Sequence, residues 1–161
     1  MTTIRTILVP TDFSEPADAA WRFAQMLASR LKSRIHLLYV VSTPYLYDAW
    51  GTEAVALRAA ELSTIAENAA RRQLRALVPR TGSLRTRVVT ATRIGLTVEQ
   101  ILKYIADKHI DLVVMGTHGR GLVGHLLLGS VAERIVQHSP VPVITLHGDT
   151  SRAVPAARRR R

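Results

Sequence analysis

The sequence predicts a single doubly wound α/β domain, in which helices cover both faces of a parallel sheet. Three observations lead to this prediction. Strand-like runs and stretches with helical spacing alternate from one end of the chain to the other. Three of the strand-like runs, residues 35–41, 111–116 and 142–147, are almost continuously apolar, as strands are when both faces are covered. The length of 161 residues is that of one ordinary domain.

Five runs rich in β-branched residues or leucine are predicted to form the strands. They are residues 6–10, 35–41, 85–91, 111–116 and 142–147. Pro142 lies inside the last run, and proline has no N–H to donate to a neighbouring strand. We therefore expect the last strand to lie at an edge of the sheet.

The helices are predicted from apolar residues spaced three and four apart. The first should bury Ala20, Phe23, Ala24, Leu27 and Leu31, the second Leu62, Ile65 and Ala69, and the third Val98, Ile101, Leu102 and Ile105. A fourth covers residues 130–138, and Pro140 stops it.

Polar residues mark where these helices begin. Ser14 is the expected N-cap of the first helix, with Pro16 in its first turn. Thr97 and Gln100 have the three-residue spacing of a capping box before the third helix. Ser130 opens the fourth.

The composition is typical of a globular protein, with 47% hydrophobic and 21% charged residues. No apolar run approaches the ~20 residues that a membrane span needs, and the N-terminus does not have the pattern of a secretory signal. Cysteine is absent, which excludes disulfides and thiol chemistry and favours a cytoplasmic location.

The formal net charge of +10 points to an anionic partner. Five of the arginines, however, lie in residues 148–161, which have no apolar periodicity. We interpret that segment as a solvated basic tail, so a nucleic-acid partner is not expected, and residues 1–147 are predicted to form the domain.

One long irregular connection follows the second strand and carries Tyr45, Tyr47 and Trp50. An aromatic segment in this position can fold over a ligand or contact a partner. Covering apolar surface at the start of the next helix is the simpler interpretation.

The segment "GTHGRGLVGHLLLGS", residues 116–130, follows the fourth strand directly. In open α/β sheets, ligands bind beyond the carboxyl ends of the strands. Gly116 and Gly119 can adopt positive φ and allow backbone N–H groups to approach an anion. Gly129 and Ser130 stand where a helix begins, and free N–H groups there favour phosphate oxygens. The segment therefore predicts a phosphate site.

Other interpretations of this segment are weaker. "GRGLVG" matches the dinucleotide pattern GxGxxG, but only one strand follows it and no acidic residue stands at the expected distance. A P-loop is absent, and a plain glycine-rich loop stays open. His118 and His125 have no triad partners and no metal-ligand spacing, so we interpret them as loop residues.

Two longer segments carry a resemblance to a known family. "MGTHGRGLVGHLLLGSVAERIVQHSPVPVITL" resembles the C-terminal signature of the universal stress protein family, in which Gly116, Gly119, Gly129 and Ser130 fit the glycine spacing. "ILVPTDFSEPADAAWRFA" and "IHLLYVV" resemble the family's first strand, first helix and second strand. The resemblance covers residues 4–147. It implies a Rossmann-like sheet in the order 3-2-1-4-5, so that strands 1 and 4 flank one crevice.

The resemblance also implies a binding site for ATP with Mg²⁺ or Mn²⁺. The residues that would contact the adenosine end lie after the first strand and on the second, and the others surround ribose and phosphates: Pro10, Thr11, Asp12, Val40, Met115, Gly116, Gly119, Arg120, Gly129, Ser130 and Val131. Asp12 has a structural alternative, because a carboxylate after a strand can also cap the turn into the following helix.

These expectations lead to a nucleotide-responsive stress regulator with at most slow hydrolysis, since no residue is evidently placed to activate water. No catalytic residue is assigned. The alternative is a dimeric interaction module that recruits protein or nucleic-acid partners without nucleotide. An adenylating ligase is the weakest option, because the chain has no room for a further substrate domain. The resemblance implies a homodimer through the last strand, residues Val141 to His147.

Overall fold

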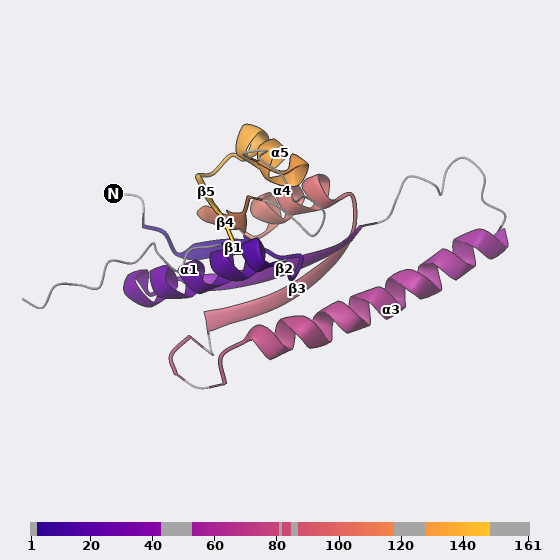
Figure 1. Cartoon of the computed structure of the whole chain (residues 1–161), viewed down its shortest axis with the longest axis horizontal. Coiled ribbons are helices and arrows are strands. Elements are labelled where there is room, and N and C mark those ends of the chain that lie inside the picture. Colours follow the sequence, from indigo (N-terminus) through magenta and orange to yellow (C-terminus); the bar gives the residue numbers. More distant parts are fainter. Residues whose placement is uncertain (1–2, 43–52, 81, 85–86, 118–127, 149–161) are drawn as a thin grey trace, which may run out of the picture.

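The computed structural model describes residues 3–42, 53–80, 82–84, 87–117 and 128–148. Its centre is a five-stranded parallel sheet in the order β3-β2-β1-β4-β5, as predicted. The strands are β1 (Thr6–Pro10), β2 (Arg34–Ser42), β3 (Val88–Gly95), β4 (Leu112–Gly116) and β5 (Val143–Leu146). The helices are α1 (Glu15–Leu31), α3 (Glu53–Leu77), α4 (Thr97–Asp107) and α5 (Ser130–His138). Figure 1 shows how the helices lie on the two sides of the sheet.

Alternating residues of the strands belong to two separate hydrophobic cores, because successive side chains point to opposite faces of the sheet. Ile7 and Val9 of β1 face α1 and α3, together with Leu74 of α3. Leu8 faces α4 and α5, together with Ile135 of α5. Both faces are therefore buried, which explains why β4 reads as an almost continuous apolar run.

The strand boundaries follow the predictions except at β3. That strand was expected at residues 85–91 but runs from Val88 to Gly95. Its register with β2 continues from Val88 opposite Ile35 to Gly95 opposite Ser42. Pairing with a long central strand thus holds the less apolar residues 92–95 in the sheet, which the local composition did not indicate. The edge position of β5 is confirmed.

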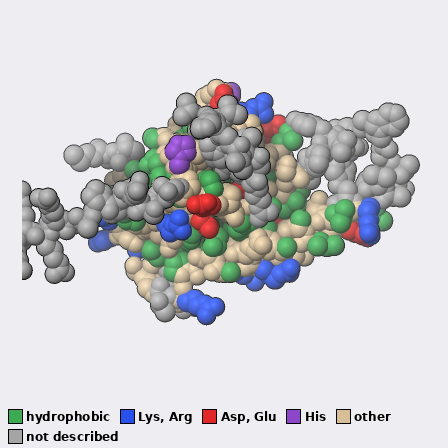
Figure 2. Space-filling view, viewed as in Figure 1, with side chains coloured by type: hydrophobic (Ala, Val, Ile, Leu, Met, Phe, Trp, Pro, Cys, Tyr) green, Lys and Arg blue, Asp and Glu red, His purple; other side chains and the backbone are tan. Residues whose placement is uncertain are grey.

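The predicted apolar face of α3 is wrong. Leu62 and Ile65 are 55% and 64% exposed, whereas Ala70 and Leu74 are buried. Ala70, Leu74 and Leu77 have the same helical spacing as the predicted stripe, so periodicity alone could not distinguish the two faces. The N-terminal part of α3 extends past the sheet (Figure 1), and blue side chains are spaced along the helix between green ones in Figure 2.

The other helices keep their predicted faces with small changes. In α1, Ala20 and Ala24 are buried, but Leu31 is 43% exposed at the end of the helix. In α4, Ile101 and Ile105 are buried as expected. In the part of the chain described above, no helix is long and apolar enough to cross a membrane.

The helix starts differ in how well the sequence predicted them. Ser14 is the N-cap of α1, and its hydroxyl accepts from the Ala17 N–H at 3.4 Å. The capping box at Thr97 is wrong, because the N-cap of α4 is Leu96, which makes no side-chain cap bond. The Gln100 side chain lies instead against Gly95, whose φ is 139°. Ser130 is the first residue of α5, and Gly129 is its N-cap.

Candidate functional site

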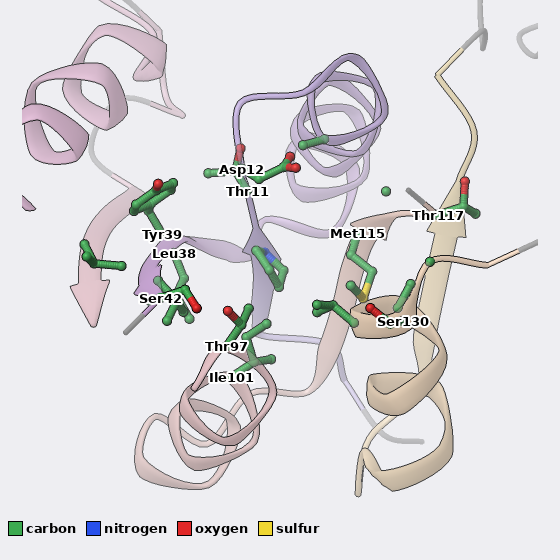
Figure 3. A pocket seen from close by; sticks show the side chains of 18 of the residues that line it. Thr11, Asp12, Leu38, Tyr39, Ser42, Thr97, Ile101, Met115, Thr117 and Ser130 are labelled. Carbon is green, nitrogen blue, oxygen red and sulfur yellow. The ribbon is translucent and has the colours of Figure 1, made fainter. Parts of the chain in front are cut away.

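A pocket of about 650 Å³ opens at the carboxyl ends of β1, β2 and β4. This is where β1 has β2 on one side and β4 on the other, so the strand order reverses there. Thr11 and Asp12 follow β1, while Thr97 and Ser130 stand at the starts of α4 and α5 (Figure 3). A cavity of this size falls within the usual range for small-molecule sites.

The structure brings together every predicted site residue that it describes. Nine of them line the pocket: Pro10, Thr11, Asp12, Val40, Met115, Gly116, Gly129, Ser130 and Val131. They come from β1, β2, β4 and α5 and are separated by up to about 120 positions in the chain. Gly119 and Arg120 lie outside the described residues, as do His118, His125 and the aromatic segment.

The turn between β1 and α1 holds its side chains by short hydrogen bonds. The Thr11 hydroxyl accepts from the Phe13 N–H at 3.1 Å. One carboxylate oxygen of Asp12 accepts from the Ser14 N–H at 3.1 Å and from the Ser14 hydroxyl at 2.5 Å. The structural role considered for Asp12 is therefore present, and the same residue lines the pocket.

Gly116 is required by packing rather than by a positive φ. Among the described glycines, positive φ values belong to Gly82 and Gly95. A Cβ added to Gly116 would lie 2.8 Å from the carbonyl carbon and the Cβ of Pro16, and 3.0 Å from the Ala17 nitrogen. The expectation that Gly116 exploits a left-handed backbone is thus wrong. Its missing side chain allows the first turn of α1 to approach β4.

The start of α5 offers backbone donors to the pocket. The first turn of any helix leaves N–H groups without intrahelical partners, and here Ser130, Val131 and Ala132 supply them. The cap residue is Gly129, which has no side chain to accept from these N–H groups. The positive end of the helix dipole also lies here, so an anionic group is favoured at this wall of the pocket.

Thr117 is a structural residue of the site that the sequence did not single out. It is 3% exposed, and its N–H donates to the Leu146 carbonyl at 2.8 Å. Its hydroxyl lies 2.7 Å from Nδ1 of His147, and its carbonyl accepts from the Gly129 N–H at 2.6 Å. Thr117 therefore connects β4, β5 and the start of α5. Its place directly after the predicted fourth strand was the available signal.

The opposite wall of the pocket is mostly apolar. Leu38, Val40 and Ile101 line it, and they belong to the core between the sheet and α4. Ser42 and Thr97 add hydroxyl groups there, and Tyr39 lies at the rim (Figure 3). Leu38, Ser42, Thr97 and Ile101 were not predicted as site residues, because they read as ordinary strand and helix positions.

A polar pair lies one layer below this wall. Nδ1 of His36 is 2.9 Å from the Tyr104 hydroxyl, and both residues are buried. Burial lowers the pKa of His36 below its ordinary value, and the charges of Arg34 and Lys108 lower this pKa further. Burial raises the pKa of Tyr104, while the charge of Arg93, 5.0 Å from the ring centroid, acts in the opposite direction. Both side chains are therefore neutral at pH 7.

The carboxylate of Asp12 is the acidic side chain among the described residues that line the pocket. Within the same described residues, no group of three His, Cys, Asp or Glu side chains is placed to hold a metal ion. A divalent cation in this pocket would therefore need most of its oxygen ligands from a bound anion and from water, which is the usual arrangement for Mg²⁺.

Comparison with solved structures of low identity supports the fold. A universal stress protein structure in complex with cAMP has a TM-score of 0.57 and 18% identity, covering 91% of this chain and 99% of that one. The universal stress protein from Archaeoglobus fulgidus in complex with dAMP has a TM-score of 0.53 and 17% identity, covering 90% and 99%. Both of these proteins hold adenine nucleotides.

More similar proteins identify the family. A universal stress protein of Thermus aquaticus is 31% identical over 144 residues, covering 87% of this chain and 96% of its own length. The structure of UspA from Lactobacillus plantarum has a TM-score of 0.73 and 28% identity, covering 91% of this chain and 99% of that one. The model of the universal stress protein family matches residues 3–147. This chain belongs to the universal stress protein family.

Proposed function

We propose that this protein binds ATP, with Mg²⁺ or Mn²⁺, in the pocket at the end of the sheet and acts in the cytoplasm as a nucleotide-responsive stress regulator. One observation carries the proposal. Residues from β1, β2, β4 and α5 that the sequence singles out meet around one pocket of about 650 Å³. The pocket has an apolar wall on one side and a helix N-terminus on the other, which suits a ligand with a base and phosphates.

The geometry suggests how the nucleotide is oriented. The adenine lies against Leu38, Val40 and Ile101, where burial of a flat apolar ring is favourable. The carboxylate of Asp12 accepts from ribose hydroxyls. The phosphates face the N–H groups at the start of α5 and the hydroxyl of Ser130.

Hydrolysis in this arrangement is at most slow. The divalent cation would enter the site bound to the phosphates, and it would neutralise part of their charge there. The described residues around the α5 end of the pocket contribute backbone N–H groups and a hydroxyl, which bind charge but are poor bases for activating water. Binding rather than turnover is therefore the function that this site supports.

The known complexes of relatives support an adenine-nucleotide ligand and also suggest competitors. The cAMP and dAMP complexes described above belong to proteins under 25% identical, so they indicate the ligand class and not the number of phosphates. AMP, ADP and cAMP are therefore the competitors to titrate beside ATP.

Thermal unfolding with and without Mg·ATP tests the proposal on nucleotide-free protein. Ligand at one hundred times its Kd adds about 2.7 kcal/mol to the free energy of unfolding, which raises the Tm of a domain of this size by roughly 5 to 10 °C. We expect that shift with Mg·ATP and a much smaller one with Mg·GTP. Equal shifts with both would contradict an adenine site.

A matched pair of variants tests whether the ligand binds in this pocket. Val40→Trp fills the apolar wall of the pocket and should abolish the Tm shift. Val89→Trp adds the same side chain on β3, where the native residue is 39% exposed and does not line the pocket. Val89→Trp should keep the wild-type shift, and an intact shift in Val40→Trp would show that ATP binds elsewhere.

A second candidate function follows from the edge of the sheet. β5 is an edge strand, and all four of its residues are half-buried in the single chain. An edge strand is a surface for pairing with another strand. We propose that Val141 to His147 pair two copies of the chain, and that this homodimer serves as an interaction module even where no nucleotide binds.

A further inference from the structure

Phe13 has a backbone conformation that its side chain does not favour. Its φ is 62°, in the left-handed region, where a bulky residue is a rare outlier. Among the described residues, the other non-glycine residues with positive φ are Lys32 and His109. Both stand at the C-terminal ends of helices, where the left-handed conformation is common. Phe13 instead lies between a strand and a helix start, directly after Asp12.

The conformation of Phe13 sets the course of the turn that holds Asp12. Thr11 is tied to β2 by its N–H, which donates to the Leu38 carbonyl at 2.9 Å. Ser14 caps α1 and binds the Asp12 carboxylate. Asp12 and Phe13 are the two residues between these fixed points, so the φ of Phe13 contributes to where Asp12 stands relative to the pocket. A relaxed φ at Phe13 would move the carboxylate.

An aromatic contact lies beside this unfavourable backbone. The ring of Phe13 is stacked on that of Tyr39, with centroids 5.1 Å apart and an angle of 23° between the planes. Tyr39 belongs to β2, which pairs with β1 through Pro10 and Leu38, and it also lines the pocket. The stack therefore joins the turn to the neighbouring strand at Tyr39, which lies at the pocket rim. Such pairs contribute an attraction beyond the burial of their area.

We propose that Phe13 is a positioning residue for nucleotide binding. Its stack on Tyr39 holds the turn in the left-handed conformation, and this conformation presents the Asp12 carboxylate to the ribose hydroxyls. Phe13 acts through Asp12 and does not itself line the pocket. This inference rests on the proposed function, because it assumes that the pocket takes an adenine nucleotide.

Two substitutions at Phe13 separate the effect of the aromatic ring from the effect of the backbone conformation. Phe13→Ala removes the ring but keeps a Cβ, so the left-handed conformation stays unfavourable and loses the support of the Tyr39 stack, while the hydrogen bonds of the turn remain. Phe13→Gly also removes the ring but makes that conformation freely accessible. We expect Phe13→Ala to raise the Kd for Mg·ATP about tenfold, equivalent to about 1.4 kcal/mol. Phe13→Gly should recover most of this loss, although both variants lose the same core contacts and have lower Tm values.

A change in the ligand tests whether the effect passes through Asp12. 2′,3′-Dideoxy-ATP has no ribose hydroxyls to donate to the carboxylate. Phe13→Ala should therefore leave the Kd for Mg·dideoxy-ATP within about twofold of that of the wild type. Tyr39→Leu removes the other ring without altering the turn sequence, and it should show the same split between ATP and dideoxy-ATP. This variant carries the test if Phe13→Ala does not fold.

Lys32 provides the matched control. Its φ is 59°, and it ends α1 at the opposite end from the pocket. Lys32→Gly should have a higher Tm than Lys32→Ala, for the same backbone reason, and both should bind Mg·ATP like the wild type. The comparison shows whether relief of a left-handed backbone changes affinity only next to Asp12.

The outcomes distinguish this inference from the function on which it rests. Wild-type protein that binds no adenine nucleotide overturns both. Wild-type protein that binds Mg·ATP, with Phe13→Ala and Tyr39→Leu equally tight, overturns the positioning role alone. Equal losses for ATP and dideoxy-ATP also overturn it, because the ring would then act on the pocket in general. The expected pattern is a loss confined to ATP and to the variants that keep a Cβ at position 13 or lack the Tyr39 ring.

Discussion

Single residues of this protein often serve packing and the site at the same time, and Gly116 is the clearest example. It lines the pocket, and the first turn of α1 lies against it. Gly116→Ala should lower the free energy of unfolding by about 1 to 3 kcal/mol, because the new methyl group meets backbone atoms that cannot move cheaply. Urea unfolding measures this loss.

Gly148 gives the control for that substitution. A Cβ there would lie 3.4 to 3.5 Å from Glu15 and Pro16, which is ordinary contact distance. Gly148→Ala should therefore change the free energy of unfolding by less than about 0.5 kcal/mol. Equal effects of the two substitutions would show that the approach of α1 to Gly116 is not tight.

His36 makes the stability of the fold depend on pH. Its folded-state pKa is lowered, mainly by burial, so the unfolded chain binds a proton more readily than the folded one. The contribution of neutral His36 is complete above the ordinary histidine pKa of 6.5, and it is lost as the pH falls below that value toward the lowered pKa of the folded state. We expect urea midpoints to decrease between pH 7 and pH 5.

His36→Asn isolates this effect, because asparagine stays neutral and can still hydrogen-bond the Tyr104 hydroxyl. The variant should show a flatter pH profile in the same range, with the exposed histidines 109, 138 and 147 unchanged. A profile as steep as that of the wild type would assign the pH dependence to other groups.

At the scale of elements, the sequence predicted the strands better than the helix faces. The buried strands are recognisable by their continuous apolar residues, and β4 is found almost where it was expected. In α3, alanine and leucine occur all around the helix, so two stripes with helical spacing compete. The packing of β2 and β3 against Leu74 decides between them, and that contact is not encoded in local spacing.

Helix starts show a similar division. Ser14 fulfils its predicted capping role because its hydroxyl reaches the N–H three residues later. Thr97 also carries a hydroxyl and has the right spacing to Gln100, yet the helix begins one residue earlier than a cap at this position requires. The extended backbone at Leu96 and the glycine before it set that boundary.

The edge of β5 carries a prediction about assembly. The Pro142 and Leu146 carbonyls accept from β4 and the residue after it, so by alternation Thr145 directs its backbone groups away from β4. Thr145→Pro should remove the outward N–H, leave the β4 ladder intact and convert the proposed homodimer to a monomer. Sedimentation or light scattering measures the mass. Thr145→Ser keeps the N–H and should remain dimeric, while a dimeric Thr145→Pro would contradict pairing through β5.

At the scale of the whole molecule, the site could be predicted only because the resemblance joined distant segments. The residue spacing by itself predicted a phosphate site after the fourth strand. It did not indicate which residues would contact the adenosine part of a nucleotide. Asp12 and Val40 reach the same pocket as Ser130 because β1 lies between β2 and β4. Thr97, Ile101 and Tyr39 were missed, since nothing in their local sequence distinguishes a pocket wall from any other core position.

The bond from the Gly129 N–H to the Thr117 carbonyl has a consequence for how this protein can vary. The two bonded atoms are 2.6 Å apart, so this bond ties the start of α5 directly to the residue that follows β4. We therefore expect the fold to tolerate substitutions and changes of length in residues 118–127 better than changes at the two residues that this bond joins. On that expectation, substitutions between these two residues can change which ligand the protein binds while the fold is retained.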